Sequence, residues 1–234
     1  MGYQSIVGSL LWASRNCYPE TACGVNLLCR VMSRPTMEAW DCAIHMVKYL
    51  HGQRHRGIRF RCDGNPIPIC YYDSSNRGDY SDSKSQYGHV VMLFGGPIIW
   101  SSKKHTHVGL SSSHNEYMAL MHACVDITWL RQLLTELGIT DMVNNPTITL
   151  GDNDQATKLS REDINTPGNR YIRTHFHFAK ECVEKQLICP RRVSTTDNIS
   201  DMMTKPLSRQ YIGYLRPMMT GYQDLPPPPD EPGL

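Results

Sequence analysis

Residues 68–75 read PICYYDSS, a run of apolar and aromatic residues that ends in an acid. The turn residues DGNP precede it at 63–66, so the run predicts a central β-strand that finishes at Asp73. An acid at the end of such a strand is unfavourable unless it is paired or bound to a metal. Asp73 is therefore the first candidate for a functional side chain.

Further strands are predicted on both sides of this central strand. IRFRC at 58–62 reads as the first strand of a hairpin that leads into it, while YGHVVMLFGG (87–96) and PIIWSSKK (97–104) follow it and are joined by a Gly-Gly-Pro turn. The longest helix is predicted over Asn115–Leu137, where apolar residues recur at helical spacing and Gly138 ends the pattern.

After this helix, strand and helix patterns alternate. TITLGD (147–152) predicts a strand, followed by a short helix (155–161), a longer helix (171–186), a strand (187–193) and a final helix from Asn198. The order β-β-β-α-β-α-α-β-α predicts an α/β fold with a mixed sheet and helices. We expect a strand that follows a helix to pair in parallel with the strand before it.

The two ends of the chain differ from this central part. Residues 3–17, 19–33 and 36–52 predict three short helices, with Pro19 and Pro35 near helix starts. Because they show no compact core of their own, we expect them to pack on something else. The tail DLPPPPDEPGL (224–234) predicts a disordered, extended end.

Charge is distributed unevenly along the chain. The net charge of only +2 over 234 residues excludes a global electrostatic argument for nucleic-acid binding. No acid lies between Cys42 and Cys62, and we call the cations of this segment the basic stretch: Lys48, Arg54, Arg56, Arg59 and Arg61. It is either a surface that faces phosphates or a solvated helix end and loop.

Cysteine usage and hydropathy indicate an intracellular protein. The nine cysteines include no Cys-x-x-Cys pair, and the first sixteen residues lack the pattern of a signal peptide. The longest apolar run, 90–100, is broken by Gly-Gly-Pro and is too short to span a membrane. The histidine pairs His105/His107 and His175/His177 have no cysteine or second histidine pair at zinc-finger spacing, so we favour structural or solvent-facing histidines over zinc ligands.

Four acids share one kind of position, at the end of a strand or the start of a helix. They are Asp73, Glu116, Asp152 and Asp201. Carboxylates that converge at one edge of an α/β layer are what a pair of Mg²⁺ ions needs, because hard cations take oxygen ligands and bridge phosphates. This constellation points to hydrolysis of a phosphodiester.

Helix capping is the alternative interpretation of three of these acids. Ser113-x-x-Glu116 is a capping-box pattern, Asp152-x-x-Gln155 is similar, and Asn198 could cap a helix with Asp201 in its first turn. Capping does not account for Asp73.

These segments together resemble a known family. The pieces are YYDSSNRGD, KSQYGHVVMLFGGPIIWSSKK, LSSSHNEYMAL, DITWLRQLLTELG, GDNDQA, HFHFAKECVEK and NISDMMTKPL, in that order between residues 66 and 207. They resemble the ribonuclease H domain of copia-type LTR-retrotransposon polyproteins. Residues 3–62 resemble the segment that follows the reverse-transcriptase palm in those polyproteins.

The resemblance implies an architecture. It is a ribonuclease H-like, five-stranded mixed sheet flanked by helices, with an N-terminal helical segment. The implied domains are a helical connection segment (1–62), a ribonuclease H-like domain (63–207), and a helix end with a Pro-rich disordered tail (208–234).

The resemblance also implies a reaction. Asp73, Glu116, Asp152 and Asp201 would bind two Mg²⁺ ions, with Mn²⁺ able to substitute, for endonucleolytic hydrolysis of the RNA strand of RNA–DNA hybrids. Selectivity for RNA would come from contacts to 2′-hydroxyls. The basic stretch, together with Ser111, Ser112 and Asn153, would contact the nucleic acid.

The context that goes with this reaction is the rest of a reverse-transcriptase polyprotein. The chain would act in the cytoplasm, the nucleus or a virus-like particle, without a membrane. The alternative function is that of a catalytically inactive remnant that binds nucleic acid or acts as a scaffold.

The chain departs from the family pattern at a few positions. Ser75 and Asn76 replace the usual second Asp and aromatic, although Asp79 remains, and Arg173 reverses a charge. Arg191–Asp201 contains no histidine of the kind that assists cellular ribonucleases H. Integrases, which share the fold, would need a Glu about 35 residues after Asp152, where this chain has Leu187.

Overall fold

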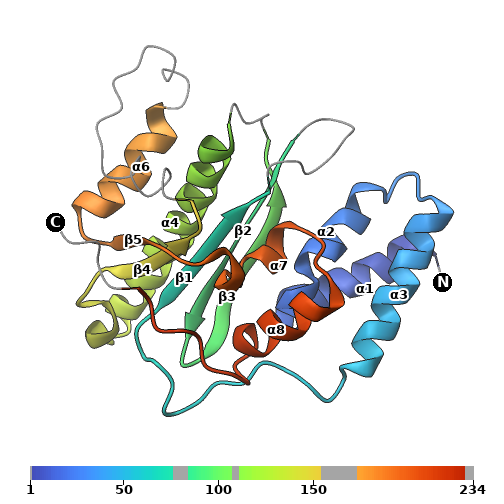
Figure 1. The fold of residues 1–234 in the computed structure, drawn as a ribbon, viewed down its shortest axis with the longest axis horizontal. Coiled ribbons are helices and arrows are strands. Elements are labelled where there is room, and N and C mark those ends of the chain that lie inside the picture. Colours follow the sequence, from blue (N-terminus) through green and yellow to red (C-terminus); the bar gives the residue numbers. More distant parts are fainter. Residues whose placement is uncertain (1, 76–83, 107–110, 154–172, 230–234) are drawn as a thin grey trace.

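The computed structural model describes residues 2–75, 84–106, 111–153 and 173–229 (Figure 1). Their centre is a five-stranded mixed sheet, as predicted, and its strand order is β3-β2-β1-β4-β5. The strands are β1 (Ile69–Ser74), β2 (Gln86–Leu93), β3 (Gly96–Lys104), β4 (Thr147–Gly151) and β5 (Ile188–Arg192). β1 is the central strand, and it pairs antiparallel with β2 and parallel with β4.

Helices cover both faces of the sheet (Figure 1). They are α1 (Tyr3–Asn16), α2 (Ala22–Arg30), α3 (Met37–Gly52), α4 (Ser112–Glu136), α6 (Arg173–Glu184), α7 (Asp201–Thr204) and α8 (Arg209–Met219), with the 3-10 turns η1 (Pro19–Thr21), η2 (Thr140–Val143) and η4 (Thr195–Asp197). Cys70 and Tyr72 of β1 point into a core with α4 and α6, while Ile69 and Tyr71 point into a second core with α7 and α8. The buried run of β1 follows from this two-sided cover.

The pairing of β4 corrects one expectation. β5 pairs in parallel with β4, the strand before it, but β4 pairs with β1 and not with β3. The outer side of β3 is covered by the N-terminal helices, because Asn26 donates to the Ser102 carbonyl and Trp100 donates to the Ser14 carbonyl. The free edge left for β4 is therefore that of β1.

The predicted hairpin strand at 58–62 is wrong. This segment is not part of the sheet, and β1 begins only at Ile69, after Pro66 and Pro68. Its backbone N–H groups bond elsewhere, from Arg59 to the Thr220 carbonyl and from Arg61 to the Phe94 carbonyl. The segment therefore connects α3 to the sheet and contacts both the β2–β3 turn and the end of α8.

The N-terminal helices do have a core of their own, contrary to expectation. Its buried members come from all three helices: Tyr3, Ile6, Val7, Leu10, Val25, Leu28 and Ala43. The three helices also dock on the rest of the chain, as expected, through a buried ion pair of Glu20 with Arg216 of α8 (2.8 Å). Tyr49 donates to Glu20 as well, so α3 and α8 share one buried carboxylate.

The C-terminal part of the chain supplies the edge strand β5 and a tail that lies against the protein. Pro190 stands in the middle of β5, the edge strand. The tail beyond α8 was predicted to be disordered and extended. The structure describes it as far as Pro229, without regular secondary structure and lying against the protein: Leu225 packs on the core shared with α8, and Arg191 donates to the Pro229 carbonyl. The predicted helix at 155–161 lies outside the described residues, and the three domain boundaries stay predictions.

Candidate metal centre

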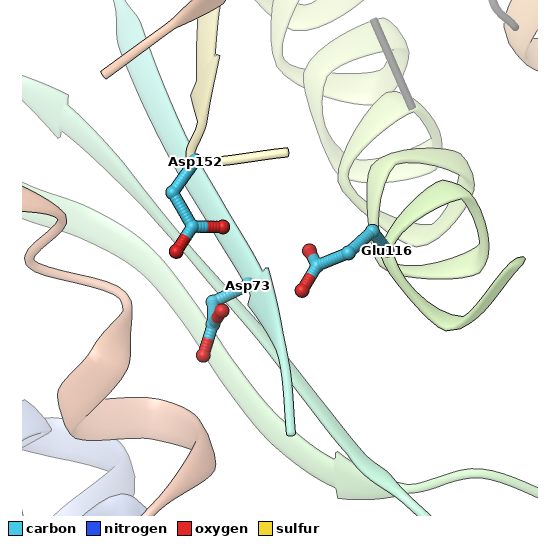
Figure 2. Close-up of side chains that lie close together, drawn as sticks. All are labelled: Asp73, Glu116 and Asp152. Carbon is cyan, nitrogen blue, oxygen red and sulfur yellow. The ribbon is translucent and has the colours of Figure 1, made fainter. Parts of the chain in front are cut away.

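Three carboxylates converge at one end of the central strand. Figure 2 shows Asp73, Glu116 and Asp152 pointing toward one another from β1, α4 and the end of β4. One oxygen from each lies within 4.8 Å of the others. Asp73 and Glu116 are buried, and Asp152 is half-buried. The structure therefore brings together three of the four acids that the sequence singled out.

The sheet explains why two of them meet. β1 and β4 are parallel and adjacent, with Tyr71 beside Leu150, so Asp73 and Asp152 lie at the same edge, two residues beyond this pair. The carboxyl ends of parallel neighbouring strands lie at the same edge of the sheet, and α/β proteins bind ligands at that edge. Glu116 is the fifth residue of α4, and it reaches the two aspartates because α4 packs on β1.

The capping interpretation of Glu116 is wrong. The helix begins two residues earlier than the pattern indicated: Ser111 is the N-cap, and its hydroxyl accepts from the His114 backbone N–H. Glu116 therefore lies in the second turn, beyond the reach of a capping box. Its Oε2 is buried and receives no hydrogen bond from the described residues. The carboxylate is oriented toward other acids and not toward the helix end.

Asp201 is the first residue of α7 and lies beside Asp73, outside the group of three. Its Oδ1 is 2.9 Å from the Lys205 ammonium, which is also 3.7 Å from Asp73 Oδ2. Thr204 donates its hydroxyl to Asp73. Asn198 does not cap α7 as expected; its side chain accepts from Ser200 and donates to the Tyr72 carbonyl, which ties α7 to β1.

Burial and mutual repulsion raise the pKa of the acids. Burial, then Asp73 and Asp152, raise the pKa of Glu116 to about 10. Burial, then Asp73, raise that of Asp201 to about 7, against the opposing effect of Lys205. The pKa of Asp152 is raised by the same causes, burial and Asp73. Acids whose pKa is raised this far by burial and by neighbouring acids are typical of functional sites such as those that bind a cation.

The residues present fit a hard divalent cation. Their donor atoms are all carboxylate oxygens, and the 4.8 Å limit is close to the span of about 4.2 Å across an ion with metal–oxygen distances of about 2.1 Å. Glu116 Oε2, buried and unbonded within the described residues, is an acceptor in need of a partner. An ion held by Asp73, Glu116 and Asp152 would satisfy that atom.

The predicted nucleic-acid contacts fall into two groups. Ser111 and Ser112 are exposed at the start of α4, and half-buried Asn153 follows Asp152, so these three border the carboxylates. The structure does not bring the basic stretch to them. The Arg61 backbone N–H donates to the Phe94 carbonyl, two residues beyond Met92, which pairs with Ile69. Arg61 therefore lies near the Ile69 end of β1, the opposite end from Asp73. Its side chain forms ion pairs with Asp63 and Asp224.

Of the other cations of the basic stretch, Lys48 lies within α3, and Arg54, Arg56 and Arg59 lie in the connection that follows this helix. Lys48, Arg54, Arg56 and Arg59 are all exposed, and the Arg54 side chain donates to the His51 carbonyl. Their part in binding nucleic acid stays a prediction.

Two residues of this centre were not singled out from the sequence, Thr204 and Lys205. The signal for Lys205 was available: it follows Asp201 by four residues, the spacing at which an acid and a base meet on a helix. Thr204 has no such signal, because its contact with Asp73 depends on how α7 packs across the sheet.

Comparisons with known proteins agree with the resemblance seen in the sequence. The chain is 35% identical over 208 residues to the retrovirus-related Pol polyprotein from transposon RE2 of Arabidopsis thaliana. It is 30% identical over 209 residues to that from transposon TNT 1-94 of Nicotiana tabacum. Each match covers 88% of this chain, but only 14% and 15% of the two relatives. No family model matches.

Among solved structures, the chain is similar to a foamy viral protease-reverse transcriptase in complex with double-stranded DNA. The match has a TM-score of 0.52 at 15% identity and covers 82% of this chain and 32% of the other. At that identity the match supports the fold alone. The chain belongs to the retrovirus-related Pol polyproteins of copia-type transposons, as a segment with a ribonuclease H-like fold.

Proposed function

We propose that this chain hydrolyses the RNA strand of RNA–DNA hybrids by internal cleavage, with the help of divalent metal ions, as part or relic of a transposon polyprotein. The observation that carries this proposal is the convergence of Asp73, Glu116 and Asp152, with oxygens within 4.8 Å, at the carboxyl end of parallel strands. The membership in the Pol family supports the choice of nucleic acid as substrate.

The residues divide the work between them. Asp73, Glu116 and Asp152 would hold the ion, which we propose is Mg²⁺ with Mn²⁺ as a substitute, and Asp201 would add a fourth carboxylate beside Asp73. When bound, such ions activate water and stabilise the charge on a leaving oxygen. Glu116, whose raised pKa keeps it protonated at neutral pH, would lose its proton as the ion binds.

The substrate would lie over the start of α4. Ser111 and Ser112 offer exposed hydroxyls there, and Asn153 offers an amide next to Asp152. Hydroxyl and amide groups suit the sugar and phosphate of a backbone, which they would position without reading bases. Contacts to 2′-hydroxyls would distinguish the RNA strand from the DNA strand.

The test is cleavage of a labelled hybrid by the purified chain in Mg²⁺ or Mn²⁺, with EDTA as the metal-free control and the same sequence as DNA duplex and as single-stranded RNA. Asp73→Asn and Asp152→Asn keep the shape of the side chain and remove its charge. We expect each to lower hydrolysis by about 100-fold or more, because a neutral amide does not offset a divalent ion.

Asp141→Asn is the matched control, because Asp141 is an exposed acid in η2, which precedes β4, whereas Asp152 follows that strand. It should cleave like the wild type. Hybrid binding without cleavage by the wild type, in either metal, would reject the enzyme and leave a non-catalytic binding module. Equal cleavage by Asp141→Asn and Asp152→Asn would remove Asp152 from the centre.

A further inference from the structure

Lys205 brings a positive charge into the group of acids. It follows the last residue of α7, and its ammonium lies 2.9 Å from Asp201 Oδ1 and 3.7 Å from Asp73 Oδ2. The two aspartates are almost fully buried, with side chains 3% and 2% exposed, whereas the Lys205 side chain is 38% exposed. The ammonium therefore lies between two buried carboxylates and reaches them from the solvent side.

This position is separate from the group of three carboxylates but shares Asp73 with it. Asp73 Oδ2 faces Lys205 and also accepts from Thr204, while Figure 2 shows the Asp73 carboxylate grouped with those of Glu116 and Asp152. An ion held by Asp73, Glu116 and Asp152 would leave the Lys205 contacts in place. A second divalent ion, between Asp73 and Asp201, would meet the ammonium directly, and like charges at this distance repel strongly.

We propose that Lys205 is a tethered cation that neutralises the Asp73–Asp201 pair in the metal-free chain and opposes a second divalent ion there. This rests on the proposed function, since it concerns the same carboxylates. The first ion then loads without displacing any protein group, and the second loads only when the ammonium withdraws. Lys205 is a positioning residue, because it acts through Asp73 and Asp201.

The ammonium has room to withdraw. A cavity of about 300 Å³ adjoins Lys205, between α7 and the N-terminal helices, and Glu20 and Tyr49 also line it. Glu20 Oε2 is buried and receives no hydrogen bond from the described residues, so it could accept one from a displaced ammonium. The long, flexible stem of lysine allows such a movement without a change in the backbone.

The test measures metal binding by the full chain without nucleic acid. Mn²⁺ is titrated into the wild type, Lys205→Gln and Lys205→Arg, and the electron paramagnetic resonance signal of free Mn²⁺ gives the number and affinity of bound ions. We expect one ion to bind more tightly than a second in the wild type and in Lys205→Arg. In Lys205→Gln the second ion should bind about tenfold more tightly, because the opposing charge is gone.

Thermal unfolding in EDTA supplies a second readout, independent of any ion. Lys205→Gln should unfold at a lower temperature than the wild type, because two buried carboxylates lose their cation, and added Mn²⁺ should raise its midpoint by more. If Lys205→Gln does not fold, Lys205→Met, which keeps the apolar stem, takes its place in both measurements.

Lys185→Gln is the matched control. Lys185, directly after α6, pairs with Glu181 of that helix at the same four-residue spacing, away from the carboxylates. It should bind Mn²⁺ like the wild type. Identical Mn²⁺ binding by the wild type and Lys205→Gln would overturn the inference and leave the proposed function standing if the wild type cleaves hybrids. Absence of both ion binding and cleavage in all variants would overturn the two together.

Discussion

Glu116 is the residue at which catalysis and helix capping make different demands. Its sequence context, Ser113-x-x-Glu116, is a capping pattern, and the structure places the cap at Ser111 instead. What remains is a buried acid that faces Asp73 and Asp152 (Figure 2), and its pKa is raised to about 10 by burial and then by those two neighbours. A residue in that position destabilises the metal-free fold whenever it is ionised.

Glu116→Gln separates these effects. A group whose pKa is higher in the folded than in the unfolded state contributes stability at low pH, and this is lost as pH rises toward the folded pKa. In EDTA the midpoint of unfolding of the wild type should therefore fall between pH 5 and pH 9, and that of Glu116→Gln should fall less. Hybrid cleavage should drop by about 100-fold or more, because Gln supplies only a neutral carbonyl.

Glu136→Gln provides the comparison on the same helix, since Glu136 is exposed near the carboxyl end of α4. Its pH dependence and cleavage should match the wild type. Parallel pH curves for the wild type and Glu116→Gln would contradict the burial argument, and near-normal cleavage would remove Glu116 from the active site.

The sequence predicted the acids of this centre better than it predicted their neighbours. Asp73 was identifiable because an acid at the end of an apolar strand has to be compensated, a constraint that acts within one segment. Thr204 and Lys205 contact it across about 130 positions of chain, with Thr204 donating over a separation of 131. No pattern within one segment carries that contact.

At the scale of elements, the position of α7 depends on a glycine in a neighbouring strand. Gly88 of β2 pairs with Asp73, and a Cβ built on it would lie 2.2 Å from Met203 Cβ. The Met203 carbonyl also accepts from Ser102 and Gln86, so α7 is held against β2 and β3 at close range. Asp201 and Lys205 are carried to Asp73 by this packing.

Gly88→Ala tests it. Met203 Cβ is next to the backbone and cannot rotate away, so α7 must shift and take Asp201 with it. We expect a loss of about 1–3 kcal/mol in the free energy of unfolding, the usual cost of overpacking, with reduced hybrid cleavage. Chemical denaturation and the cleavage assay measure the two effects.

Gly213→Ala is the control for the glycine substitution itself. Gly213 is exposed in α8 with no heavy atom within 4 Å of a Cβ built there, so the change should be neutral or stabilise by up to about 1 kcal/mol. Wild-type stability and activity in Gly88→Ala would show that α7 does not need this close approach.

Element prediction from the sequence succeeded where local pattern decides and failed where distant partners do. The apolar stripe of α4 gave its carboxyl end and its buried face, including Leu120 and Ile127. Segment 58–62 has the composition of a strand, but its backbone partners, Thr220 and Phe94, are supplied by remote parts of the chain. The core of the N-terminal helices was missed because each helix contributes only a few of its residues.

At the scale of the whole molecule, the basic stretch and the carboxylates lie at different ends of β1. A hybrid duplex would have to extend across the molecule to contact both. If it does, Arg54 and Arg56, both exposed, each neutralise a phosphate and release counterions. If it does not, they form a solvated surface.

The double change Arg54→Gln with Arg56→Gln distinguishes contact with phosphates from a solvated surface. Contact with phosphates predicts weaker hybrid binding and a plot of log K against log salt that is flatter by roughly one unit per lost contact. Fluorescence anisotropy of a labelled hybrid over a series of salt concentrations measures it. Arg209→Gln, which removes an exposed charge at the start of α8, is the comparison, and an equal slope in all three proteins would mean a solvated surface.

No helix within the described residues is long and apolar enough to cross a membrane.

The N-terminal helices are joined to the rest by more than the chain connection, since both side chains of the Glu20–Arg216 pair are buried. Removing one partner of such a pair costs about 3–5 kcal/mol in other proteins, so this contact couples the folding of α1–α3 to that of α8.

Pro190, in the edge strand β5, bears on how copies of this protein behave when crowded. The Val193 N–H points inward, to the Gly151 carbonyl, and by the two-residue alternation of a strand the nitrogen of Pro190 points outward. That nitrogen carries no hydrogen, so the rim of the sheet lacks a donor at its midpoint. This gap in the row of donors disfavours edge-to-edge pairing of neighbouring copies along β5, and so works against fibrous aggregation at high local concentration.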